Sequence, residues 1–170
     1  MPLKDVRYAG PLYLALNPVY ARTPLSGRGA ERYGGRFNPK GVPALYTALA
    51  PGTALLEANQ VGSLQPTILV SYTADLGPVF DARDEGEIER YGMSAAMLGD
   101  PAWRMRMLDG QAVHTQDFAR RLIADGFAGL LIKSFAKGAS ASDFNIVAWN
   151  WTGAGRALAV VDDEDRLSRM

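Results

Sequence analysis

Three residues that could act together on a ligand follow one another at short spacing near the N-terminus. Arg36 lies in the stretch GGRFNPKG, Tyr46 follows ten residues later, and Glu57 comes another eleven residues along the chain. An arginine fork can bind two phosphate oxygens at once, and an aromatic ring offers a flat face to a planar ligand. Spacing alone leaves a second interpretation open, in which Arg36 is solvated and Glu57 lies on an exposed helix face.

Arg36 belongs to a long segment, residues 21–43, that is rich in Gly, Arg and Pro and shows neither helical nor strand periodicity. A connection of this length in a compact domain is more often functional than incidental. It matches neither nucleotide-binding fingerprint, because Arg32 stands where G-x-G-x-x-G needs its third glycine and Lys40 is not followed by Ser or Thr as in a P-loop. Arginines such as Arg28 and Arg36 could still hold a small anion, and the alternative is a solvated loop.

The polar side chains of Glu57 and Ser134 can each be interpreted in two ways. Glu57 is set among apolar residues in LLEA, and burying its carboxylate would cost several kcal/mol unless a partner satisfied it. Ser134 ends the apolar run LLIKSF, where its hydroxyl could bind a ligand or could only satisfy nearby backbone groups.

The composition argues against several classes of protein and site. The 170 residues contain no cysteine and a single histidine, His114, which disfavours disulfides, thiolate metal ligands and a serine–histidine triad. The 18 basic residues equal the 18 acidic ones, which argues against a large nucleic-acid footprint. No apolar run approaches the roughly 18 residues that would span a membrane, and the start MPLKDVRYAG lacks the apolar core of a secretory signal. We therefore expect a cytoplasmic protein with no bound metal and no direct contact to nucleic acid or membrane.

Two helices are predicted next to the candidate residues. One covers residues 51–62, with Pro51 in its first turn and Thr53 as a possible cap. The other covers residues 115–126 and places apolar side chains on one face. Short helices and loops are expected between residues 81 and 110.

The remaining periodic segments predict strands rich in β-branched and aromatic residues. We expect them at residues 6–16, 43–49 and 67–76, and beginning at residues 127, 144 and 157. Many strands with few short helices favour an α+β fold with mixed or antiparallel sheets over a βαβ array. One domain is expected over residues 1–170, with a polar tail at 162–170.

The segment PLSGRGAERYGGRFNPKGVPALYTALAPGTALLEA, residues 24–58, resembles the signature of the RES domain, the toxin half of RES–Xre toxin–antitoxin pairs. The later stretch GLLIKSFAKGASASDFNIVAW is similar to the C-terminal part of that family, so the resemblance extends over about residues 25–149. The family is named for an Arg, a Glu and a Ser, and its characteristic residues fall here on Arg36, Tyr46, Glu57, Ser134 and Asn145. The family usually has GGRW where this chain has Phe37, and the segment 91–115 has no counterpart that we can place.

The resemblance implies an ADP-ribosyltransferase-like fold and an enzyme that breaks the nicotinamide–ribose bond of NAD, its substrate. Such an enzyme would deplete NAD as a glycohydrolase or phosphorylase, or it would be a mono-ADP-ribosyltransferase that modifies a host protein. A non-catalytic module that binds a nucleotide or a partner is the third possibility. An Xre-type helix-turn-helix antitoxin is the implied partner.

The resemblance also implies a role for each residue. Arg36 would pair with the pyrophosphate, Tyr46 would stack on or enclose the nicotinamide ring, and Glu57 would accept a hydrogen bond from a ribose hydroxyl. Ser134 would bind the ribose or the amide group, and Asn145 would contribute to the same nucleotide site. Arg28 is a candidate for a second phosphate contact from its place in the loop.

Overall fold

A single mixed sheet of seven strands organises the chain. The computed structural model describes residues 5–60, 63 and 65–170. The strands lie side by side in the order β4-β5-β6-β2-β1-β3-β7, and all neighbouring pairs are antiparallel except β4 and β5. Their bounds are β1 Tyr8–Leu16, β2 Leu45–Ala48, β3 Ile68–Leu76, β4 Val79–Asp81, β5 Gly129–Lys133, β6 Phe144–Ala148 and β7 Ala157–Val160.

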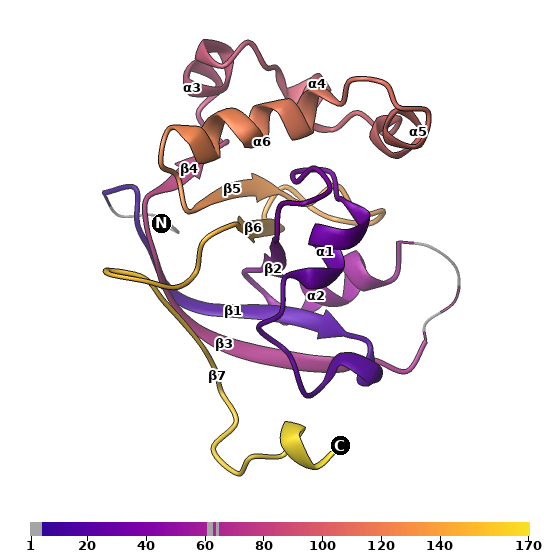
Figure 1. Cartoon of the computed structure of the whole chain (residues 1–170), viewed down its shortest axis with the longest axis vertical. Coiled ribbons are helices and arrows are strands. Elements are labelled where there is room, and N and C mark those ends of the chain that lie inside the picture. Colours follow the sequence, from indigo (N-terminus) through magenta and orange to yellow (C-terminus); the bar gives the residue numbers. More distant parts are fainter. Residues whose placement is uncertain (1–4, 61–62, 64) are drawn as a thin grey trace.

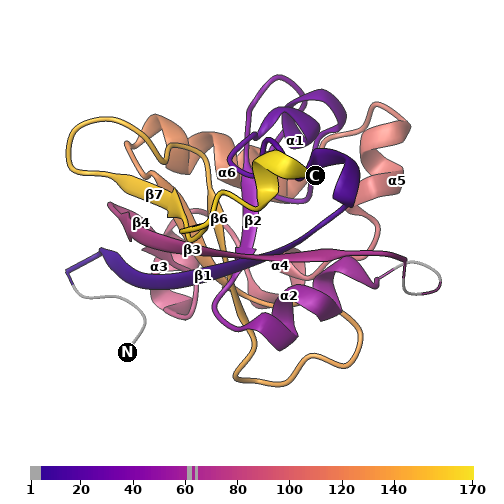
Figure 2. The ribbon, with the colours of Figure 1, turned by 90° about the horizontal axis from the view of Figure 1, so that it is seen from below.

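Short helices cover the sheet in two places. The helices α3 to α6 form a layer over the strands β4 to β6, and α2 packs along β1 (Figures 1 and 2). The helical bounds are η1 Pro18–Tyr20, α1 Arg28–Tyr33, α2 Pro51–Ala58, α3 Glu85–Arg90, α4 Ala95–Leu98, α5 Trp103–Leu108, α6 His114–Ala124 and η2 Leu167–Arg169. None of these helices combines the length and the apolar character needed to cross a bilayer.

Two apolar clusters fill the space on either side of the sheet. The first is built around β1 and β3 and contains the fully buried Leu12 and Tyr72. The second lies under α6, where Phe118 and Leu122 meet Leu130 of β5. Burial of these side chains is the main favourable contribution to folding, and it fixes the helical layer against the sheet.

The structure confirms the predicted α+β fold and most of its elements. Each predicted strand is present, and Pro51 occupies the first turn of α2 as expected. One prediction was wrong in the loop 21–43, because residues Arg28–Tyr33 form the short helix α1. The predicted helix 51–62 ends at Ala58, and residues 61 and 62 lie outside the described part of the chain.

The predicted cap of α2 was also wrong. Ala50 stands at the N-cap, and Thr53 points its hydroxyl instead to the Asp143 carboxylate, outside the helix. Thr53 is buried, and its bond ties α2 to the segment that precedes β6. This bond places the helix that carries Glu57 next to the strand that carries Asn145.

Candidate active site

A pocket of about 670 Å³ opens where the GGRF turn, α2, α5 and the strands β1, β2, β5 and β6 meet. Pockets that bind small molecules usually measure about 300–1,000 Å³. The polar, charged and aromatic side chains of its lining are those of Tyr13, Arg36, Phe37, Tyr46, Thr47, Glu57, Gln60, Trp103, Arg104, Lys133, Phe135, Lys137 and Asn145. The residues singled out from the sequence at positions 36, 46, 57 and 145 therefore converge on one cavity.

Glu57 projects from α2 and is half-buried. Its Oε1 accepts hydrogen bonds from Ser134 Oγ at 2.5 Å and from Asn145 Nδ2 at 2.5 Å. Its Oε2 accepts one from the exposed Gln60 amide. Ser134 is itself buried, with only 7% of its surface exposed, so α2, β6 and the end of β5 hold the carboxylate in one orientation.

Asn145 has a free acceptor on the same side chain. Its Nδ2 is used by Glu57, whereas its Oδ1 is buried and has no hydrogen-bond partner among the described residues. A buried acceptor without a donor costs about 1–3 kcal/mol. This unpaired oxygen lies beside Glu57, on a residue that lines the pocket.

Arg36 crosses from the GGRF turn to the helical layer. Its Nη1 donates to the carbonyl oxygen of Leu98 at the end of α4, at 3.4 Å, and to that of Asp100 in the following loop, at 2.8 Å. Its guanidinium carbon lies 4.9 Å from the ring centre of Phe135 and 5.8 Å from that of Trp103. Burial lowers the pKa of this guanidinium, and the nearby carboxylate of Glu57 opposes that effect. No other hydrogen bond joins this guanidinium to a described residue, and Arg36 lines the pocket.

Tyr46 lines the pocket with its ring and uses its hydroxyl to hold the GGRF turn. The hydroxyl accepts from the Phe37 backbone N at 3.0 Å and donates to Asn38 Oδ1 at 2.6 Å. Burial raises the pKa of the Tyr46 hydroxyl well above its ordinary value, so it keeps its proton as a donor. The structure thus gives Tyr46 a positioning contact in addition to the predicted wall of the pocket.

Buried side chains hold the same turn from its other sides. Asn38 is fully buried, and its Nδ2 donates to the carbonyl oxygens of Ala30 and Val42, both at 2.9 Å. Trp149 Nε1 donates to the Phe37 carbonyl at 2.9 Å, and Gln116 Nε2 donates to the Gly35 carbonyl at 2.9 Å. These hydrogen bonds hold the backbone of the GGRF turn in place.

The pocket is strongly cationic. Arg36, Arg104, Lys133 and Lys137 line it, and among the described residues Glu57 is its one carboxylate. Lys133 Nζ lies 5.5 Å from the Phe135 ring centre, and the Arg104 guanidinium lies 5.1 Å from that of Trp103. Positive groups interleaved with aromatic rings suit a ligand that combines phosphates with planar rings.

Comparison with known proteins identifies the family and the fold of the chain. The family model of the RES domain matches residues 11–169. The chain belongs to the RES domain family. One solved structure with the same fold is the MbcT–MbcA toxin–antitoxin complex of M. tuberculosis, with a TM-score of 0.63, 22% sequence identity, and coverage of 92% of this chain and 83% of that one. No curated protein matches the sequence significantly.

The RES residues inferred from the sequence fall into two groups. Arg36, Tyr46, Glu57 and Asn145 line the pocket, and Ser134 contacts it through Glu57. Arg28 is exposed at the start of α1 and is not part of the lining. The structure therefore gives no support to a phosphate contact from Arg28, and Arg104, Lys133 and Lys137 take that place as candidates.

Several residues of this RES domain were missed by sequence reasoning. Trp103 and Arg104 lie in the segment 91–115 that could not be placed, and nothing in their local pattern signals a pocket. Gln116 did leave a signal, because helical periodicity puts it on the same side as Ala119 and Ile123, which pack inward. No group of three His, Cys, Asp or Glu side chains gathers around a metal-sized space in the part of the RES domain that the structure describes.

Proposed function

We propose that this protein is the toxin of a toxin–antitoxin pair and that it cleaves the bond between nicotinamide and ribose in NAD. The observation that carries this proposal is the Glu57 carboxylate, held on one oxygen by Ser134 and Asn145 inside a cationic pocket. Membership of the RES domain family supports the same activity. So does the likeness in fold to a structure of a toxin–antitoxin complex.

The chemistry needs one oriented carboxylate. Cleavage breaks the bond between ribose C1′ and the pyridinium nitrogen, and the electron pair leaves with nicotinamide, which becomes neutral without accepting a proton. Positive charge then develops on the ribose, as in glycoside hydrolysis, and a fixed carboxylate stabilises it. Glu57 would accept a hydrogen bond from a ribose hydroxyl and orient the nucleophile that adds at C1′. The hydrogen bonds from Ser134 and Asn145 remove the need to reorient the carboxylate during the reaction.

The pyrophosphate of NAD would face the cationic side chains. Arg36 keeps donors free after its bonds to Leu98 and Asp100, and Arg104, Lys133 and Lys137 add charge around the cavity. The aromatic rings of Tyr46 and Trp103 would flank the planar groups of the substrate. We also propose that a helix-turn-helix antitoxin binds this protein, as the family implies.

Release of nicotinamide from NAD tests the proposal. Glu57→Gln keeps the side chain's size and removes its charge, and it should slow nicotinamide release roughly 10²–10³-fold, the scale for one preorganised electrostatic contact. Arg36→Ala should also lower the rate. Glu89→Gln, an exposed glutamate in α3 outside the pocket, is the matched control and should leave the rate unchanged.

Products identify the acceptor of the ADP-ribose. Free ADP-ribose indicates hydrolysis, ADP-ribose phosphate indicates phosphorolysis, and a mass increase on a host protein indicates a mono-ADP-ribosyltransferase. Binding of NAD without release of nicotinamide would show that the protein is a non-catalytic binding module and not an enzyme. Equal rates for the parent and both variants would show that Glu57 and Arg36 are not the site.

A further inference from the structure

We propose that Gln116 is a positioning residue that fixes the backbone from which Arg36 reaches the substrate. The assignment of Arg36 as a substrate contact rests on the proposed function, but the contact that Gln116 makes is independent of it. Gln116 is in α6, is 5% exposed, and donates from Nε2 to the Gly35 carbonyl at 2.9 Å. The two residues are 81 positions apart in the sequence, so this bond joins the helical layer to the turn.

The bond acts on one of the two peptide groups that flank Arg36. The Gly35 carbonyl belongs to the peptide that precedes Arg36, and the Phe37 N–H belongs to the peptide that follows it. Gln116 holds the first group, and the Tyr46 hydroxyl holds the second at 3.0 Å. Because a residue's φ and ψ are the rotations between its two flanking peptides, these two bonds together restrict the backbone conformation of Arg36.

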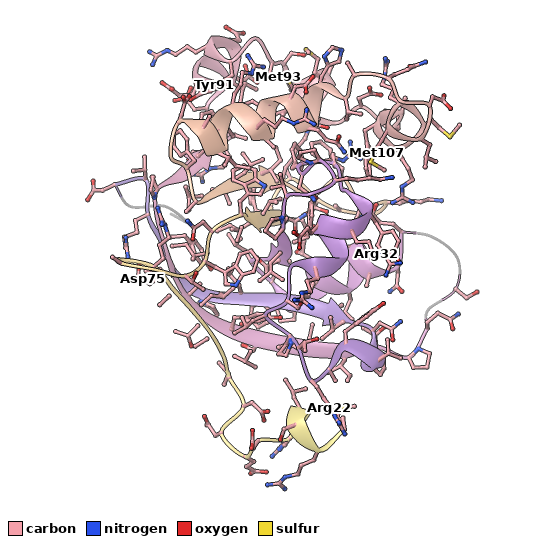
Figure 3. The ribbon with its side chains drawn as sticks, in the orientation of Figure 1. Arg22, Arg32, Asp75, Tyr91, Met93 and Met107 are labelled. Atoms are coloured by element: carbon pink, nitrogen blue, oxygen red, sulfur yellow. The ribbon has the colours of Figure 1, made fainter. Side chains whose placement is uncertain are left out.

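The turn has little freedom to reach this arrangement in another way. A Cβ atom at Gly35 would collide with the Tyr46 hydroxyl and with Asn38 Oδ1, so glycine lets the backbone approach both groups. Gly34 has φ of +73°, and a Cβ atom there would lie 2.8 Å from Met107 Sδ. Met107, labelled in Figure 3, also lies 3.3 Å from Gln116 Nε2, so α5 and α6 enclose the turn from one side.

The far end of Arg36 depends on the same helical layer. Its guanidinium donates to the carbonyl oxygens of Leu98, at the end of α4, and Asp100, in the loop before α5. Gln116 fixes the backbone at one end of this side chain, and the α4–α5 segment fixes the charged group at the other. A shift of about 1 Å in such a contact can cost about 10²-fold in rate. The α4–α5 segment and the first turn of α6 thus form the frame for Arg36.

Replacement of Gln116 by methionine tests this role. Gln116→Met keeps the length of the side chain and removes the N–H donor, and kcat/KM for NAD should fall roughly 10–100-fold. Whichever of KM and kcat changes in Arg36→Ala should also be the one that changes in Gln116→Met. In the Arg36→Ala background the further effect of Gln116→Met should be less than about twofold, because the two residues act through one contact.

Thr115→Val is the matched control on the same helix. Thr115 is 1% exposed, its Oγ1 has no partner among the described residues, and valine has nearly the same shape. Activity should be unchanged in this variant. A merely structural role of Gln116 predicts a lower unfolding midpoint with unchanged kcat/KM for the folded protein, and that result would overturn the proposal. An equal fold-loss of kcat/KM on Gln116→Met in the parent and in the Arg36→Ala background would also overturn the proposal.

Hydrogen–deuterium exchange separates a failure of this inference from a failure of the proposed function. Backbone amides at positions 35–38 should exchange faster in Gln116→Met than in the parent, and they should be unchanged in Thr115→Val, whether or not the protein consumes NAD. If Gln116→Met does not fold, Gln116→Leu is measured instead, because it also removes the donor and places no charge in the buried site. Unchanged exchange at the turn in the folded variant would overturn the positioning role.

Discussion

At the scale of single residues, the side chains that build the site do so mostly by holding one another. Tyr46 was expected to wall off a nicotinamide ring, and its ring does line the pocket, but its hydroxyl is committed to the turn that carries Arg36. Ser134 likewise reaches the pocket only through Glu57. A family residue can therefore matter because it orients the group that touches the substrate.

Removal of the Tyr46 hydroxyl should expose this double role. Tyr46→Phe leaves the Phe37 N–H and Asn38 Oδ1 without their partner, and the free energy of unfolding should fall by about 1–3 kcal/mol. Urea unfolding measures the change, and nicotinamide release should fall in the same variant because Arg36 is less well fixed. Tyr20→Phe, at an exposed tyrosine outside the pocket, is the control. A Tyr46→Phe midpoint equal to that of the parent would contradict the buried hydrogen bonds.

At the scale of elements, α2 is placed by a bond that sequence reasoning assigned differently. Thr53 was expected to cap the helix, yet it is buried and donates to Asp143, whose other carboxylate oxygen accepts from the Ser140 N–H at 2.7 Å. Glu57 lies one helical turn after Thr53, on the same side of α2. The loop before β6 thus sets the position of the Glu57 carboxylate.

This contact predicts a dependence of stability on pH. Hydrogen bonds from Thr53 and Ser140 hold the pKa of Asp143 below its ordinary value of 3.8. The ionised carboxylate therefore stabilises the folded state fully above about pH 4, and the contribution is lost as the pH falls through the lower folded-state pKa. Asp143→Asn should lower the urea midpoint at pH 7 and flatten its decline between pH 4 and pH 2.

The control for this prediction is Asp163→Asn, at an exposed residue of the polar tail. It should leave both the midpoint and its pH dependence unchanged. An acid decline of equal steepness in Asp143→Asn and in the parent would show that the Thr53–Asp143 contact does not carry the effect.

A structural feature could be predicted from the sequence where neighbouring residues form a recognisable pattern. Six of the seven strands and α6 were predicted because their apolar residues repeat with the period of the element, whereas the three-residue strand β4 was missed. Glu57 and Arg36 were found from short motifs. The helix α1 was missed because its six residues, RGAERY, include few apolar ones and lie between glycine-containing segments. The bonds from Gln116 to Gly35 and from Thr53 to Asp143 join residues 81 and 90 positions apart, and no local pattern encodes such pairs.

At the scale of the whole molecule, the pocket lies where the neighbouring strands β1 and β2 meet with little pairing. The register of β1 and β2 contains a single pair, Tyr13 with Ala48, although β1 pairs with β3 along its full length. Both members of that pair line the pocket, together with residues of β5 and β6. A ligand in the pocket therefore contacts both halves of the sheet at the place where they meet.

Binding of ADP-ribose should consequently stabilise the entire fold. A ligand at 100 times its Kd contributes about 2.7 kcal/mol to the free energy of unfolding, which for a chain of this size raises the thermal midpoint by roughly 5–10 °C. The rise should shrink with added salt and in Arg104→Gln, because the cationic lining attracts the pyrophosphate. Adenosine, which lacks the phosphates, should raise the midpoint less at equal concentration. A midpoint that stays constant up to millimolar ADP-ribose would contradict a nucleotide site in this pocket.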